Sequence, residues 1–289
     1  MLFDLTPLVD AFGSLASGTV ASAVLGLAVG FVSAFLGIGG GFVFTPYLHS
    51  VLQLSAPAAV ATSMGQIPFM SLSGSIQYFR KKKIRFDLAF WLLLGSLPAA
   101  QIVALFIGRV DELEIGRDVV WQGMTVADLF LLVQYGFIIG LMGIYNLYRS
   151  FREQDDSGGE RESVLAAGWK RNTITLIAGI FFGGLSALLG IGGGFLAVPF
   201  LVYLCGLEPV EGVATSLFAI FVTASLTTLN YVIHDQLYLG ISLTIALGSV
   251  AGAFLGSRFA VRVKQSYILR TFGALQIMVV FGYLLLKLG

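Results

Sequence analysis

The sequence predicts an all-α polytopic membrane protein built from two inverted repeats of five helical elements, each with a Gly-rich re-entrant helical hairpin. Three observations lead to this fold class: the composition, an internal repeat and the placement of the basic residues. Of the 289 residues, 57% are hydrophobic and only 11% are charged, whereas soluble domains carry about 25% charged residues. The apolar residues form blocks of roughly 18–25, which is long enough to cross a hydrocarbon core about 30 Å thick.

The second observation is an internal repeat. Residues 33–42 read SAFLGIGGGF, and residues 186–195 read SALLGIGGGF. When the chain is displaced by 153 residues, its halves align without a gap from Gly30 to Arg109. Such a repeat in a membrane protein is typical of duplicated transporter architectures, in which the ligand lies between the two halves.

Each half is predicted to contain five apolar segments. In the first half they cover residues 19–36, 42–52, 56–79, 86–108 and 126–148. In the second half they cover residues 172–189, 195–205, 210–233, 237–257 and 267–288. Because residues 149–171 are polar and mixed in charge, we interpret them as a cytoplasmic linker. The predicted units are a first membrane repeat at 1–148, this linker at 149–171 and a second membrane repeat at 172–289.

The glycine runs are predicted to separate two helices. One helix over residues 19–52 would be about 51 Å long at 1.5 Å per residue, which is too long for a core of about 30 Å. The chain must therefore turn near Gly37 to Gly41, and the helix that follows would be only about 16 Å long. This length predicts a re-entrant hairpin with its tip near mid-membrane. Gly190 to Gly194 predict a second hairpin by the same argument.

The basic residues favour the same topology. If each glycine run lay inside a single spanning helix, eleven of the 17 Lys and Arg residues would be cytoplasmic. If each run is the tip of a hairpin, fourteen of the 17 are cytoplasmic, and the positive-inside rule prefers this second arrangement. Each half then has five elements, so the halves insert in opposite directions with both termini outside.

The glycine runs have three interpretations. A dinucleotide-binding fingerprint is a poor match, because Phe42 stands where a third glycine is needed and no βαβ unit surrounds it. A purely structural role, in tight turning and close helix packing, would explain the runs without any ligand. In the third interpretation, the helix after each run begins with unsatisfied N–H groups that favour an anion. The sequence favours an anion site between the two tips and leaves the packing interpretation open.

Hydroxyl and amide side chains in the third segment of each half are the predicted side-chain donors. Thr62-Ser63 and Thr215-Ser216 are matched by the repeat, and Gln77 is matched by Asn230. For any single hydroxyl, a bond within its own helix is the simpler explanation. The complete candidate substrate-binding set is Gly37, Gly39, Gly40, Gly41, Phe42, Thr62, Ser63, Gln66, Gln77, Gly190, Gly192, Gly193, Gly194, Phe195, Thr215, Ser216 and Asn230.

Other classes of function lack support in the sequence. A net charge of +1 gives no basis for nucleic-acid binding, and the single Cys205 excludes an intrachain disulfide. We expect no cofactor, no metal and no enzymatic activity, because no nucleophile and base occur in a motif context. No Asp, Glu, Lys or Arg lies deep inside a segment, so a proton relay built from carboxylates is not expected.

The doubled GIGGGF motif, the Pro nine residues after its first glycine, the Ala-Thr-Ser step and the duplicated layout together resemble the TauE/SafE family. This family is also called the 4-toluene sulfonate uptake permease family, and the resemblance covers most of the chain. It implies a secondary transporter of a small inorganic or organic anion such as sulfite or an organosulfonate. Position 65 is Gly while its counterpart is Phe218, so the two halves of the site are not equivalent.

We therefore predict alternating access at a midplane site in the plasma membrane, the inner membrane of a bacterium. A passive anion channel on the same site is the alternative, and a scaffold that uses the glycines only for packing is a third reading. The expected partners are the anion and membrane lipid, with no nucleic acid, and a homodimer is left open.

Overall fold

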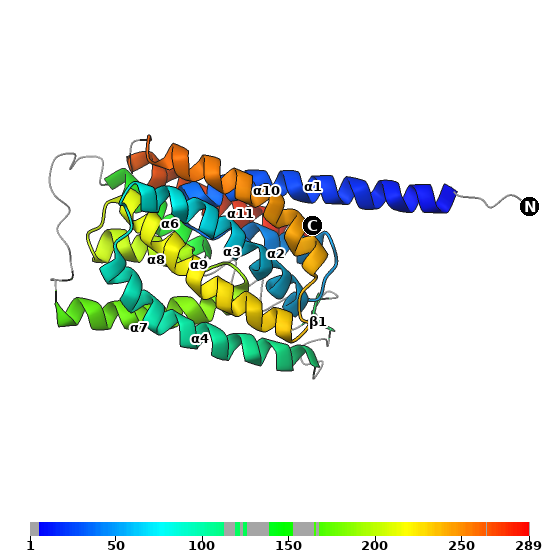
Figure 1. The fold of residues 1–289 in the computed structure, drawn as a ribbon, viewed down its shortest axis with the longest axis horizontal. Coiled ribbons are helices and arrows are strands. Elements are labelled where there is room, and N and C mark those ends of the chain that lie inside the picture. Colours follow the sequence, from blue (N-terminus) through cyan, green and yellow to red (C-terminus); the bar gives the residue numbers. More distant parts are fainter. Residues whose placement is uncertain are drawn as a thin grey trace, which may run out of the picture.

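The structure is a computed structural model that describes residues 6–112, 119–121, 124–125, 139–152, 165, 168–263 and 265–288. Nearly all of these residues are helical (Figure 1), which confirms the predicted all-α class. One short departure from this class is an antiparallel pair of strands, in which Val119 pairs with Thr125 and Trp121 with Met124. The helices and strands are α1 (Thr6–Leu36), α2 (Gly41–Ser50), α3 (Ala56–Arg80), α4 (Phe86–Glu112), β1 (Val119–Trp121), β2 (Met124–Thr125), α6 (Gly140–Arg152), α7 (Trp169–Leu189), α8 (Gly194–Pro199), the π-helix η3 (Phe200–Leu204), α9 (Pro209–Ile233), α10 (Leu239–Ala260) and α11 (Gln265–Leu288).

Four helices among the described residues are long and apolar enough to cross a membrane. They are Phe86–Phe106 within α4, together with α7, α9 and α10. The predicted segment at 126–148 is described only from residue 139 onward, and most of the predicted linker at 149–171 lies outside the described residues. The division of the chain into two membrane units and a linker stays a prediction.

Two helix boundaries differ from those expected. The first helix begins at Thr6 instead of residue 19, and Figure 1 shows it extending far beyond the other helices at its N-terminal end. In the second half, the short segment after the glycines changes from α8 to the π-helix η3 directly after Pro199. Proline removes one backbone donor and crowds the preceding turn, and a π-helical turn is one way to accommodate this change.

One type of helix–helix contact occurs twice in the molecule, in two pairs of helices that the repeat relates to each other. Helix α1 packs along α10, and their counterparts in the repeat, α7 and α4, pack along each other in the same way. At both contacts a glycine allows the backbones to approach closely: an added Cβ would lie 2.5 Å from the Cα of Ser249 at Gly30, and 2.5 Å from the Cα of Ser96 at Gly183. Figure 1 shows α1 and α7 running in opposite directions along the long axis of the helices.

The core surrounds the two glycine-containing connections. Phe42 and Phe195, the second residues of α2 and α8, are each 1% exposed. Two fully buried tyrosines occupy matching places on α3 and α9. The hydroxyl of Tyr78 donates to the carbonyl of Ala34 at 2.7 Å, and that of Tyr231 donates to the carbonyl of Ala187 at 3.4 Å. Each tyrosine thus fixes the end of the helix that leads into a glycine turn.

Candidate functional site at the two glycine turns

The two glycine runs form tight turns with nearly the same backbone conformation. Gly40 has a φ of 75° and Gly193 a φ of 76°, a left-handed conformation that residues with a Cβ rarely adopt. Each of these residues precedes the first residue of a helix, α2 or α8. The turns therefore separate two helices, as the length argument predicted.

The turns are packed against each other through their backbones. A Cβ added to Gly41 would collide with the carbonyl oxygen of Gly190, and a Cβ added to Gly194 would collide with that of Gly37. These two contacts are equivalent under the repeat. Only residues without side chains allow this approach, so the packing interpretation accounts for part of the run.

Two serines of the predicted site hold the turns together. The hydroxyl of Ser63 donates to the carbonyl of Gly190 at 3.1 Å, and the hydroxyl of Ser216 donates to the carbonyl of Gly37 at 3.1 Å. Each serine thus belongs to one half and bonds the turn of the other. These hydroxyl hydrogens are already used in bonds to the protein.

The two matched threonines accept hydrogen bonds from backbone N–H groups just before two helices. Thr62 accepts a hydrogen bond from the backbone N–H of Tyr238 at 3.1 Å, just before α10. Thr215 accepts one from the N–H of Arg85 at 3.0 Å, just before α4. The N–H groups at the start of a helix have no partner within it, and these hydroxyls pair two such part-buried donors.

The structure does not bring the matched amides to the turns. Gln77 follows Ser63 by 14 residues on α3, and Asn230 follows Ser216 by 14 residues on α9, a distance of about 21 Å along each helix. The side chain of Asn230 instead donates to Gln101 on α4 at 3.1 Å. Both amides therefore lie near the far ends of their helices.

The helices that begin at the turns have no side-chain caps. Gly40 and Gly193 are the N-cap residues of α2 and α8, and no side chain accepts a bond from either first turn. An uncapped helix start carries a partial positive charge and favours an anion. The N–H groups of Gly41, Val43 and Leu196 nevertheless donate to backbone carbonyls of the turns, so part of each start is already used within the protein.

Two serines that the prediction omitted lie beside these uncapped starts. Ser33 and Ser186, the first residues of the repeated motif, are 0% and 4% exposed. The hydroxyl of Ser33 is buried without a hydrogen-bond partner. Among the described residues no hydrogen bond involves the Ser186 side chain either. Their repeat-matched place before each glycine run was the sequence signal that could have identified them.

A cavity of about 30 Å³ lies beside the second turn. It exceeds the roughly 10–15 Å³ that one water requires. Two of its hydroxyls, on Ser96 and Thr223, bond to each other at 2.9 Å. The residues around the cavity are Leu92, Ser96, Phe182, Gly183, Ser186, Gly192, Gly193, Ala197, Ser216, Ala219, Ile220 and Thr223. The surface of the cavity is therefore almost entirely apolar, and its lining contains no charged side chain.

A comparison with protein families decides the identity of the chain. Residues 22–284 match the model of the family described as "Sulfite exporter TauE/SafE". The chain belongs to the TauE/SafE family. This membership confirms the resemblance based on the doubled glycine motif, and it agrees with a multi-pass membrane protein.

Several relatives of this TauE/SafE chain carry transporter names. A probable membrane transporter protein of Xylella fastidiosa is 28% identical over 255 residues, which cover 87% of this chain and 89% of the relative. The probable membrane transporter protein YunE of Bacillus subtilis is 28% identical over 251 residues, covering 84% and 87% of the two chains. No solved structure matches the chain.

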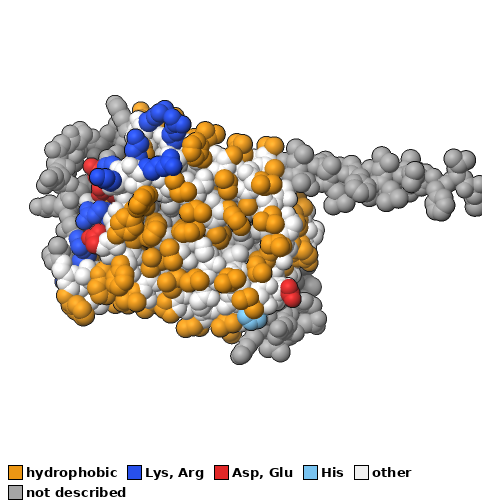
Figure 2. Space-filling view, viewed as in Figure 1, with side chains coloured by type: hydrophobic (Ala, Val, Ile, Leu, Met, Phe, Trp, Pro, Cys, Tyr) orange, Lys and Arg blue, Asp and Glu red, His pale blue; other side chains and the backbone are white. Residues whose placement is uncertain are grey.

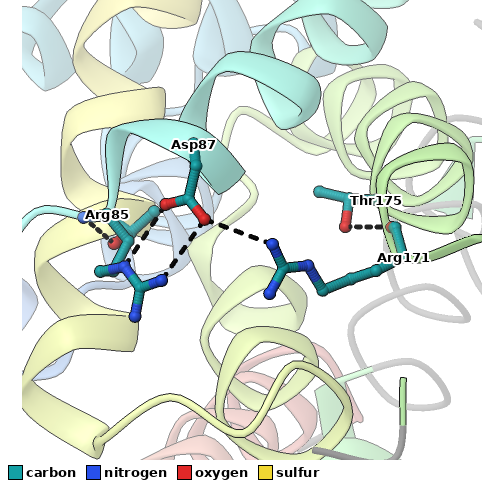
Figure 3. A network of polar contacts seen from close by, with 5 residues as sticks. Arg85, Asp87, Arg171 and Thr175 are labelled. Carbon is teal, nitrogen blue, oxygen red and sulfur yellow. Dashed lines mark hydrogen bonds and ion pairs between the residues drawn. The ribbon is translucent and has the colours of Figure 1, made fainter. Parts of the chain in front are cut away.

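One end of this TauE/SafE protein is basic and ion-paired. Figure 2 shows the Lys and Arg side chains gathered at one end of the visible face. There Asp87 on α4 contacts Arg85 at 3.3 Å and Arg171 on α7 at 3.4 Å (Figure 3). Lys83 pairs with Glu208, which directly precedes α9, at 2.9 Å. The Asp87–Arg171 and Lys83–Glu208 pairs connect the two halves on the side that the sequence assigns to the cytoplasm.

Cys205 is buried and lies near this basic end. Among the described residues, no group of three His, Cys, Asp or Glu side chains could hold a metal ion.

Proposed function

We propose that this chain is a secondary transporter of a small anion, namely sulfite, an organosulfonate or a related sulfur oxyanion. The observation that carries this proposal is the meeting of two helix starts without side-chain caps at the glycine turns, beside a cavity that Ser186 helps to line. The family description supplies the class of anion. Neutral donors bind an anion without fixing a charge in the membrane, which favours weak and reversible binding.

The anion would be held by backbone N–H groups at the start of α8 and by hydroxyl donors on the cavity wall. Its desolvation would be offset by the dipoles of the short helices that point at it. The apolar walls exclude water, which strengthens these electrostatic contacts. No fixed positive charge is required in this arrangement.

We further propose that the two repeats are inverted across the membrane and alternate in exposing the site. The opposite directions of α1 and α7 in Figure 1 support this arrangement. The gathering of Lys and Arg at one end in Figure 2 supports a cytoplasmic assignment of that end. With both turns near the midplane, rocking of one repeat against the other would open the site to each side in turn.

The orientation is tested by labelling single cysteines introduced at Lys82 and Arg262 in whole cells, in a Cys205→Ser background. Both positions are exposed, and both should be protected from a reagent that does not cross the membrane. Labelling of one position but not the other would contradict the inverted arrangement.

The transport function is tested with purified protein in liposomes. Flux of sulfite should saturate with concentration and depend on a counter-ion gradient. Flux that increases linearly and simply follows the membrane voltage would favour a passive channel on the same site. Absence of both flux and anion binding would leave packing as the only role of the glycines.

A further inference from the structure

The surroundings of the two glycine turns differ beside Gly40 and Gly193. A Cβ added at Gly193 would have its three nearest atoms on Phe182 and Ser186, both from α7. A Cβ added at Gly40 would instead meet Sδ of Met70 at 3.2 Å and Nε2 of Gln66 at 3.4 Å. Side chains of α3 therefore fill, beside the first turn, the place equivalent to the cavity beside the second.

Five cavity residues differ from their counterparts in the repeat. At three of them the first-half residue is the larger one, since Ala197, Ala219 and Thr223 correspond to Phe44, Gln66 and Met70. The other two are Leu92, which corresponds to Ile245, and Phe182, which corresponds to the smaller Val29. The serines are the same in both halves: Ser33 matches Ser186, Ser63 matches Ser216, and Ser96 matches Ser249. The set of serines is thus duplicated, while the described cavity lies beside the second turn.

The side chain of Gln66 is buried beside the first turn, and its amide nitrogen has no hydrogen-bond partner. Its side chain is 0% exposed, and its Oε1 accepts a hydrogen bond from the Ser249 hydroxyl at 3.1 Å. Its Nε2 has no hydrogen-bond partner, and neither does the adjacent Ser33 hydroxyl. Buried polar groups are normally paired, so the unpaired Nε2 shows that Gln66 fills the space beside the turn without completing its hydrogen bonds.

We infer that Gln66 occupies, in the first half, the place that a small anion takes in the second half. The protein then has one anion site per chain, at the cavity beside Gly193. Gln66 blocks a second, equivalent site beside Gly40. Gln66 directs its Nε2 towards Gly40 and its Oε1 towards Ser249, so this neutral side chain takes the place by its volume and does not offer the turn an acceptor oxygen as an anion would. The inference rests on the proposed function for the class of ligand, a sulfite or a sulfonate with a short alkyl group.

The first test fills the cavity with the residue of the other half. Ala219→Gln should abolish the thermal stabilisation of the purified protein by sulfite and by methanesulfonate, because a ligand that binds only the folded state raises its apparent stability. Thr223→Met fills the same space with an apolar chain and should also abolish the thermal stabilisation. It provides the test if Ala219→Gln does not fold. Glu211→Gln, two turns earlier on α9, is the matched control and should keep the wild-type response.

The second test empties the first-half pocket. Calorimetric titration of the wild type with sulfite should give one ion per chain, and Gln66→Ala combined with Met70→Thr and Phe44→Ala should give two. Two ions per wild-type chain, or unchanged affinity in folded Ala219→Gln and Thr223→Met, would overturn the inference alone. One ion in the folded triply substituted protein would show that Gln66 does not replace a ligand. No binding of either anion to the wild type would overturn the proposed function as well.

Discussion

The two halves of the molecule share their backbone framework but differ in the side chains that fill it. Both halves have the same turn conformation, the same serine bond to the opposite turn and the same tyrosine bond to the preceding helix. The described cavity lies in the second half, and Asp87, which joins two arginines, corresponds to Gly240 in the repeat. The difference teaches that the shared backbone framework fixes the two turns, whereas the side chains packed around it decide where space remains.

The largest effects should come from adding a methyl group where the turns touch. Gly41→Ala and Gly194→Ala would each place a Cβ against a backbone carbonyl of the other turn. We expect a loss of about 3 kcal/mol or more in the free energy of unfolding, at the upper end of the cost of overpacking. The loss should be similar in both halves.

These effects can be measured as the melting temperature of the detergent-purified protein. Gly240→Ala is the control, since nothing lies within 4 Å of a Cβ added there. A melting temperature close to that of the wild type for either turn variant would contradict the direct contact of the turns.

The next largest effect separates the two halves. Ser186→Ala should weaken sulfite binding about 10- to 100-fold, because a hydrogen bond to a charged group contributes about 1.5–3 kcal/mol. Ser33→Ala should change it far less, since Gln66 and Met70 occupy the space beside that serine. Binding isotherms of the two variants make this comparison, and equal losses would show that both turns bind the anion.

A moderate effect is expected from the two serines that join the turns. Ser63→Ala and Ser216→Ala each remove the donor to a buried carbonyl, with an expected cost of about 1–3 kcal/mol. The two costs should be alike because the bonds are equivalent. Thermal unfolding of both single variants and of the double variant tests this, and a cost confined to one half would break the proposed equivalence.

The smallest effect should come from the ion pairs at the basic end. Asp87→Asn removes the contacts to Arg85 and Arg171, but the Asp87 side chain is 45% exposed. Partly exposed pairs contribute about 1 kcal/mol or less, so the melting temperature should fall only slightly. The difference from the wild type should shrink in high salt, and a large loss that salt does not reduce would assign these pairs a greater role.

Several features were predictable because they depend on local sequence. The length of each apolar segment and the run of glycines located the turns at Gly37 to Gly41 and Gly190 to Gly194, and the helix ends agree at Leu36 and Leu189. The start of α1 was placed too late, because residues before 19 carry no signal that ends a helix. The pairing partners of hydroxyl groups were harder to predict, since Thr62 and Ser63 are adjacent in sequence yet bond to α10 and to the second turn.

The sequence by itself determined that this is a duplicated helical membrane protein with a glycine turn in each half. Composition, segment length and spacing are properties of neighbouring residues, and they constrain helices and turns directly. Only the tertiary structure decided that Ser63 and Ser216 hold the opposite turns, that Ser33 and Ser186 are left without partners, and that Gln66 fills a place left open in the other half. Whether a polar group is free or paired depends on residues more than 100 positions away, and their approach is fixed by helix packing and not by local spacing.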